Sequence, residues 1–188
     1  YLNMRAADVG WDLISICNSL GLVVGEDIMF PPDFSVQKGL SVEDLNKAFN
    51  CADVLVSTAT GGGWELSLTQ AFATRTLTVM PANTSHVELC GNQADINETR
   101  GILYKSGSNL AQLTVFNSDN EVVRPLPDLD DMVSKLKWVA DNRDGEACNK
   151  IRDNAYNWTK NSLSWEKHIA PKFHNAFTMA KNLKMQRL

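Results

Sequence analysis

The chain lacks several features that mark large classes of protein. It has no excess of positive charge, because 18 Lys and Arg residues stand against 22 Asp and Glu residues and give a formal net charge of −4. A basic surface for nucleic acid is therefore not indicated, and we predict no nucleic-acid partner. The 188 residues contain no apolar run long enough to cross a bilayer and no recognisable secretory signal peptide. We accordingly predict no membrane-spanning segment.

Cysteine is also sparse. The four cysteines, Cys17, Cys51, Cys90 and Cys148, are widely spaced, and none belongs to a Cys-x-x-Cys pair. This pattern predicts buried free thiols in a reducing compartment. Three Asn-x-Ser/Thr triplets are present, but without a secretion signal we interpret them as chance and expect a cytoplasmic protein.

The stretch from Asp53 to Pro81 is the most informative part of the sequence. It contains an apolar run at 53–57, three glycines at 61–63, a helical pattern at 64–74 and a second apolar run at 77–80. This order is typical of the βαβ crossover of a parallel sheet. Because glycine has no Cβ, the turn lets a ligand approach closely, and the following helix directs unpaired N–H groups at one spot. That spot suits phosphate or another anion.

The glycine turn alone leaves its role open, because a glycine run before a helix is also compatible with a plain turn. The spacing matches neither the phosphate loop, since no Gly-Lys-Ser/Thr follows, nor the Gly-x-Gly-x-x-Gly dinucleotide fingerprint. Further on, His86 and Glu88 invite a metal or acid–base role, but the Pro-Cys-x-x-Cys motif of a zinc deaminase is absent. We therefore expect ordinary surface or capping roles for both, and no metal site.

The order of elements in the first half predicts the fold class. Ahead of the central stretch we expect a helix at 8–20, a short strand at Ile28–Phe30 and a helix at 41–50 opened by a capping box. This alternation predicts an α/β, Rossmann-like doubly wound sheet in which Ile28–Phe30, Asp53–Ser57 and Leu77–Met80 are parallel strands. The glycine turn would then lie at their C-terminal edge, where ligands of such sheets bind.

The second half of the chain predicts a hairpin followed by helices. Leu113–Phe116 and Glu121–Arg124 flank Asn-Ser-Asp-Asn, which is typical of a β-hairpin. An aspartate then caps a helix at 128–142, and further helices are expected at 146–158 and 164–183. The last helix carries an apolar stripe that we interpret as core packing, and its Pro171 should bend it.

A group of residues that begins at the end of the second predicted strand forms a motif with a definite spacing. It consists of Ser57, Gly62-Gly63-Trp64, Gln70-Ala71-Phe72-Ala73 and Val79. In spacing and hydrophobic pattern, this motif resembles the donor-binding motif of the retaining glycosyltransferases of family 4, which have the GT-B fold. In that family two glutamates stand where this chain has Gly62 and Gln70, and a Gly and a Pro stand where it has Arg75 and Leu77.

Shorter matches lie in the family's order along the rest of the chain. They are Leu20-Gly21-Leu22, Ile28-Met29-Phe30, Ser41-Val42-Glu43-Asp44-Leu45, Asn50-Cys51-Ala52-Asp53-Val54, Gly101-Ile102-Leu103-Tyr104 and Ser164-Trp165. The usual family pattern contains no hairpin at 113–124, so we interpret that hairpin as an insertion.

The resemblance implies a nucleotide-sugar site at the glycine turn. It makes donor-binding candidates of Gly61, Gly62, Gly63, Trp64, Glu65 and Gln70, with Ser57, Thr58 and Glu88 as weaker candidates. Backbone N–H groups of the turn would hold the diphosphate, and Gln70 would bind a ribose hydroxyl in place of a carboxylate. No cofactor is expected besides the donor substrate, and transfer would be metal-independent and would retain the anomeric configuration. No catalytic residue is assigned.

In this interpretation residues 1–188 form a single nucleotide-sugar-binding domain, truncated at its N-terminus, that is the C-terminal, donor-side half of a GT-B glycosyltransferase. Its partner would be the missing N-terminal acceptor-binding domain, and the chain alone should not transfer sugar. A second hypothesis is a degenerate, non-catalytic domain for binding or scaffolding, because Gly62 and Gln70 replace both glutamates. A third, a sugar-nucleotide epimerase, would need a His in a matching motif, and none of the three His provides one.

Overall fold

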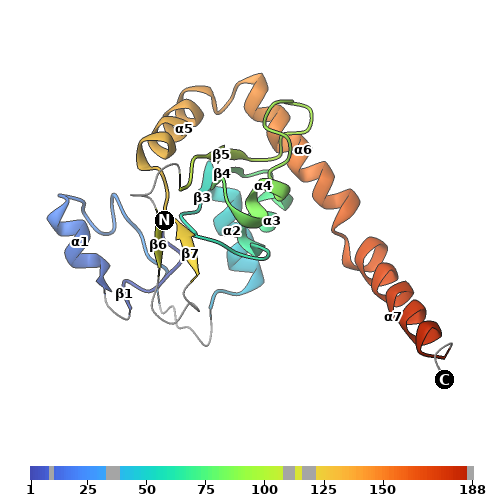
Figure 1. The fold of residues 1–188 in the computed structure, drawn as a ribbon. Helices are drawn as coiled ribbons and strands as arrows, with labels where there is room; N and C mark the ends of the chain where they lie inside the picture. Colours follow the sequence, from blue (N-terminus) through green and yellow to red (C-terminus); the bar gives the residue numbers. More distant parts are fainter. Residues whose placement is uncertain (9–10, 33–38, 108–112, 116–121, 186–188) are drawn as a thin grey trace. The chain divides into compact units, whose positions relative to one another are not determined.

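The structure is a computed structural model that describes residues 1–8, 11–32, 39–107, 113–115 and 122–185 (Figure 1). The residues group into two compact units, 1–45 and 46–188. The second unit contains the parallel sheet and every residue predicted to form the site.

The first unit begins with a short antiparallel pair, β1 (Ala7–Asp8) and β2 (Trp11–Asp12), followed by helix α1 (Leu13–Ser19). The predicted helix therefore starts later than residue 8. The reason is that the Asp12 carboxylate accepts hydrogen bonds from the N–H groups of Ile14 at 3.0 Å and Ser15 at 3.3 Å. This side chain caps the helix and fixes its first residue.

The predicted strand at Ile28–Phe30 is wrong. Of these residues only Ile28 joins a β-bridge, and its partner is the nearby Val24. The carbonyl of Val23 accepts from the N–H of Asp27 at 2.9 Å, and the Asp27 carboxylate accepts from the N–H of Val23 at 2.8 Å. The segment thus closes on itself as a tight turn, so its short apolar run does not join the parallel sheet.

Helix α2 (Val42–Cys51) confirms the predicted helix and its cap. The hydroxyl of Ser41 accepts from the N–H of Asp44 at 3.0 Å and donates to the Asp44 carboxylate at 2.7 Å. This exchange satisfies an N–H group at the helix start that has no partner within the helix.

The sheet of the second unit has three parallel strands in the order β3 (Val54–Val56), β4 (Leu77–Pro81), β5 (Ile102–Tyr104). Val54 lies opposite Leu77, and Val79 lies opposite Ile102. Helices α3 (Leu66–Ala73) and α4 (Thr84–Leu89) follow β3 and β4. Two of the three strands predicted as parallel are confirmed, and the third strand of the observed sheet is β5.

Helices cover both faces of this sheet (Figure 1). Alternate residues of a strand point to opposite faces, so β4 contributes to two cores. One core joins the sheet to α5 (Leu129–Asn142) and α6 (Glu146–Ser162), and it contains Leu77, Val79, Ile102, Tyr104, Val139, Cys148 and Ile151. The other joins the sheet to α3, α4 and α6, and it contains Leu68, Phe72, Met80, Leu89, Cys90 and Ala155.

The predicted hairpin and helix cap of the second half are confirmed. Strands β6 (Leu113–Val115) and β7 (Val123–Pro125) pair antiparallel, and the predicted loop between them lies outside the described residues. The Asp128 carboxylate accepts from the N–H of Asp131 at 3.1 Å and caps α5. The described cysteines are free, but Cys51 is exposed rather than buried as predicted.

The last predicted helix is divided. A π-helical turn, η2 (Trp165–Ile169), precedes α7 (Ala170–Met185). Pro171 has no N–H to donate to the carbonyl four residues earlier, which explains why the regular ladder changes just before it. The interpretation of the apolar stripe as core packing is wrong, because Trp165, Phe173 and Phe177 are 64%, 51% and 69% exposed. No described helix is long and apolar enough to span a membrane.

Helix α3 ends in a strained residue. The N–H of Thr76 donates to the carbonyl of Ala71 and that of Arg75 to the carbonyl of Phe72, which is the Schellman arrangement. Arg75 therefore adopts the left-handed conformation, with φ of 62°, at a position that favours glycine. Its side chain pairs with Asp153 and lies over the ring of Tyr156, 5.0 Å from the centroid.

We predict that Arg75→Gly is more stable than Arg75→Ala by about 1–2 kcal/mol, the cost of a left-handed residue that has a Cβ. Both substitutions remove the same side-chain contacts, so their difference isolates the backbone strain. Urea denaturation of the two variants measures it. Equal free energies of unfolding would show that the left-handed conformation at Arg75 costs nothing.

Candidate functional site

A polar network lies where the three parallel strands end. Ser57 follows β3, Asn83 follows β4 and Ser106 follows β5. The Asn83 amide donates to the carbonyl of Ala59 at 3.1 Å and to the Ser106 hydroxyl at 3.2 Å, and thereby joins the three loops. Loops at the C-terminal edge of a parallel sheet are where open α/β folds bind ligands.

The glycine turn lies at this edge and exposes backbone donors. The N–H of Gly62 donates to the Thr84 hydroxyl at 3.1 Å. Within the described part of the chain, the N–H groups of Gly63 and Trp64 have no acceptor. A Cβ on Gly62 or Gly63 would meet nothing within 4 Å, so the space beside the turn is open.

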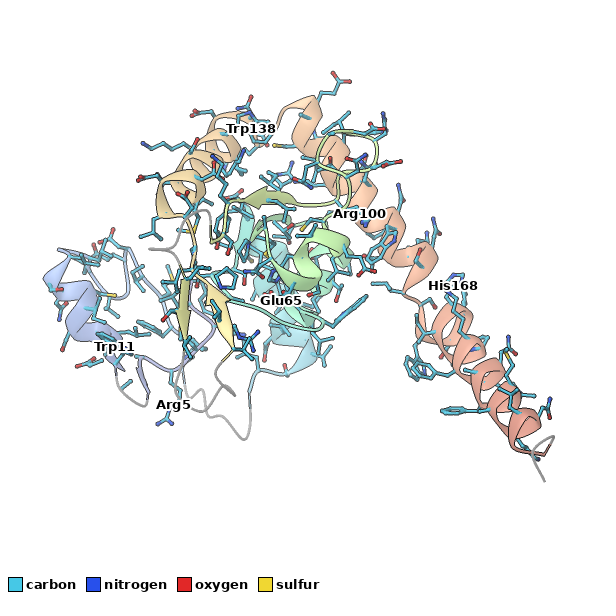
Figure 2. The ribbon with its side chains drawn as sticks, in the orientation of Figure 1. Arg5, Trp11, Glu65, Arg100, Trp138 and His168 are labelled. Atoms are coloured by element: carbon cyan, nitrogen blue, oxygen red, sulfur yellow. The ribbon has the colours of Figure 1, made fainter. Side chains whose placement is uncertain are left out.

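Glu65 stands at the N-cap position of α3, yet its side chain makes no capping hydrogen bond. One carboxylate oxygen accepts from Ser67 at 2.9 Å, and the other contacts the Ser57 hydroxyl at 3.3 Å and Nε2 of His86. In Figure 2, Glu65 lies near the middle of the second unit. Because the carboxylate is turned to these partners, it leaves the first-turn N–H groups of α3 uncapped.

His86 is fully buried, so the expected surface or capping role is wrong. Its Nδ1 lies 3.1 Å from the Asn83 side-chain oxygen, which can only accept, so Nδ1 carries a proton. Its Nε2 faces the Glu65 carboxylate. The ring therefore bridges Asn83 and Glu65, and its contact with Glu65 is a partly buried hydrogen bond to a carboxylate.

The electrostatics of the network favour the ionised form of Glu65. Desolvation by burial raises the pKa of Glu65, but the hydrogen bonds from His86 and Ser67, the charge on His86 and the hydrogen bond from Ser57 together outweigh it and lower the pKa. Burial, and secondarily the Glu65 charge, raise the pKa of Tyr104 to about 12. The Tyr104 hydroxyl therefore stays protonated and donates to the Ser57 carbonyl at 2.8 Å.

Thr84 has a strained backbone within the network. Its φ is 40°, an uncommon conformation for any residue other than glycine and a genuine outlier for a β-branched one. Its hydroxyl donates to the Asn83 side-chain oxygen at 3.0 Å while accepting from Gly62. The Thr84 hydroxyl thereby ties the glycine turn to the loop after β4.

The predicted site residues fall into two groups. Ser57, Gly61, Gly62, Gly63 and Glu65 lie together at the turn and in the network. Thr58, Trp64, Gln70 and Glu88 are exposed, and within the described chain none of their side chains makes a hydrogen bond. Asn83 and Thr84 were not among the predicted site residues, although their position directly after a buried strand was a usable signal. His86 was considered but was expected at the surface or as a cap.

A hollow of about 440 Å³ lies elsewhere in the second unit. Its lining includes Ile96, Thr99, Trp138 and Ile102, and Ile102 begins β5. The hollow is therefore at the opposite end of that strand from the polar network. Trp138 and Glu65 are also well separated in Figure 2.

Comparison with solved structures identifies the fold. Sucrose-phosphate synthase from Thermosynechococcus elongatus superposes with a TM-score of 0.65 at 13% identity, over 91% of this chain and 34% of that one. The C-terminal domain of a group 1 glycosyl transferase from Francisella tularensis superposes with a TM-score of 0.54 at 15% identity, over 81% of this chain and 61% of that one. The chain has the fold of a GT-B C-terminal domain. No family model and no curated protein matches its sequence.

The GT-B assignment confirms the predicted α/β class and the resemblance stated from the sequence. The chain spans about a third of the sucrose-phosphate synthase and about three fifths of the second structure. In this GT-B domain the polar network and the glycine turn occupy one edge of the parallel sheet.

We predict that protonation of the Glu65 carboxylate lowers the stability of the folded chain as the pH falls. Its pKa is lower in the folded chain than the ordinary value of 4.5, so it stabilises the fold above that pH and the contribution is lost as pH falls through the folded value. Glu65→Gln should therefore flatten the decline of melting temperature between about pH 5 and pH 3. Glu146→Gln, at an exposed position, is the control, and equal slopes in both variants would contradict the assignment.

Proposed function

We propose that the chain binds a nucleoside-diphosphate sugar at the glycine turn, as the donor-binding part of a retaining glycosyltransferase. The observation that carries the proposal is the orientation of Glu65. Its carboxylate binds His86, Ser57 and Ser67 rather than the start of α3, so the helix N-terminus and the turn keep N–H donors without a protein acceptor in the described chain. Such donors, with the positive end of the helix dipole, suit a diphosphate.

The remaining parts of the donor are assigned by position. Gln70, exposed on the second turn of α3, would bind one ribose hydroxyl through its amide. The Trp64 ring, 48% exposed beside the turn, offers an apolar surface next to the nucleotide. The donor sugar has no assigned partner, because Gly62 has no side chain and Glu65 already accepts three hydrogen bonds.

In this proposal, sugar transfer requires a larger protein of which the chain is one part. The chain spans only part of the two glycosyltransferase structures that it resembles. An acceptor-binding domain would supply the other wall of the site, and transfer would retain the anomeric configuration and use no metal. The 188-residue chain alone should then bind the donor without turning it over.

A second candidate function is a non-catalytic binding or scaffolding domain. The observation in its favour is that Glu65, the carboxylate nearest the turn, is held by three protein donors and is not available to the donor sugar. The two functions differ in what they predict for nucleotides, because a scaffold that has lost the donor site should not bind them.

We expect uridine, guanosine or adenosine diphosphate to raise the melting temperature of the chain. A ligand at a hundredfold excess over its Kd adds about 2.7 kcal/mol of stability, which corresponds to a shift of about 5–10 °C for a chain of this size. Differential scanning fluorimetry with each diphosphate and its parent nucleoside measures the effect. If none of the diphosphates shifts the transition, the scaffold function replaces the donor-binding one.

We further predict that Gln70→Glu binds the preferred nucleotide more tightly. A hydrogen bond to a charged partner contributes roughly 1.5–3 kcal/mol against roughly 1 kcal/mol for a neutral one. The gain should reach about tenfold at most, because the new carboxylate also repels the diphosphate. Gln70→Ala should weaken binding by a similar factor and leave the ligand-free melting temperature nearly unchanged. If calorimetric titration gives equal affinities for the parent chain, Gln70→Glu and Gln70→Ala, Gln70 takes no part in nucleotide binding.

A further inference from the structure

An arginine from the predicted insertion lies against the glycine turn. A Cβ on Gly61 would lie 2.7 Å from a terminal guanidinium nitrogen of Arg124 and 3.3 Å from the methyl group of Thr84. Any side chain at position 61 would therefore displace the guanidinium. The absence of a side chain at Gly61 is thus what lets a positive charge stand beside the exposed N–H groups of the turn.

The hairpin geometry explains why Arg124 points toward the turn. Arg124 lies opposite Thr114 in the β6–β7 pair, and both are half-buried. Their neighbours Val115 and Val123 are 52% and 57% exposed. Since successive side chains of a strand point to opposite faces, Arg124 and Thr114 share the face that is turned away from solvent.

The base of the hairpin is fastened to the network. The N–H of Gly107 donates to the carbonyl of Leu126 at 3.0 Å, and that of Asp128 donates to the carbonyl of Lys105 at 3.0 Å. The Ser106 hydroxyl, at the same base, accepts from Asn83. These bonds tie β7 to the end of β5 and hold Arg124 in register with the loops that form the site.

The charges around the turn leave Arg124 suited to an anion. Glu65, a carboxylate of the network, is already engaged by His86, Ser57 and Ser67. Arg124 has a further partner within the chain, but a guanidinium has five N–H donors and can bind a phosphate at the same time. Its planar fork matches the oxygens of a phosphate group.

We propose that Arg124 binds the diphosphate of the donor together with the turn at 61–64, which makes the β6–β7 hairpin a wall of the nucleotide site. The inference rests on the proposed donor-binding function. It adds that the positive charge for the diphosphate comes from the inserted hairpin, and that Gly61 is needed because the guanidinium occupies the space of its side chain.

The test is calorimetric titration of the 188-residue chain with uridine, guanosine and adenosine diphosphates. Arg124→Gln should weaken the preferred diphosphate by about tenfold to a hundredfold, the loss of one charge-assisted hydrogen bond. Arg124→Lys should weaken it less, because the charge is kept and the fork is lost. Arg143→Gln is the matched control: it removes an exposed arginine that pairs with Asp53, just before β3 and therefore at the other end of the sheet.

Gly61→Ala provides a second, independent variant. It should weaken diphosphate binding in the parent chain and weaken it less in an Arg124→Gln background, where the displaced group is gone and only the backbone strain at φ of 157° and the contact with Thr84 are left. Circular dichroism melting verifies that each variant is folded. If Arg124→Gln does not fold, Arg124→Lys and Gly61→Ala decide the matter.

Two failures are distinguishable. If the parent chain binds none of the three diphosphates, the proposed function is wrong and the role of Arg124 is wrong with it. If the parent chain binds one of them and folded Arg124→Gln binds it as well as Arg143→Gln does, only the role of Arg124 is overturned. A lower melting temperature with unchanged affinity would assign Arg124 a purely structural role.

Discussion

The pair formed by Glu65 and His86 is the interaction on which the rest of the site depends. Glu65 precedes α3 and His86 lies in α4, so their contact joins helices that follow two different strands. Removing one partner of a buried hydrogen bond costs about 1–3 kcal/mol, since the other polar group is left unsatisfied. The same contact holds the carboxylate away from α3, and this leaves the N–H groups of its first turn available to an anion.

The sequence predicted the elements whose signals are local. The caps at Ser41 and Asp128 use side chains within three residues of their donors, and both are found as predicted. The runs that became β3 and β4 flank a helix of the right length for a parallel crossover. The run at Ile28–Phe30 failed because three apolar residues do not reveal that Asp27 closes a tight turn beside them.

The site was only half predictable for a physical reason. The glycine turn and Glu65 belong to one contiguous motif, so the spacing of residues in the sequence was enough to find them. His86 reaches Glu65 across 21 residues and Asn83 reaches Ala59 across 24. Those contacts exist because parallel strands end at a common edge, and only the sheet order brings the loops together. His86 carries no local signal that separates a buried side chain from an exposed one.

Two residues other than glycine, Arg75 and Thr84, have a positive φ, and their strain arises for different reasons. The strain at Arg75 is a helix ending, and its side chain finds compensation in Asp153 and Tyr156. The strain at Thr84, of order 1–3 kcal/mol, ends no helix, and the Thr84 hydroxyl bonds to Asn83 and to the glycine turn. From its place beside open backbone donors, we infer that this strain serves the proposed binding site.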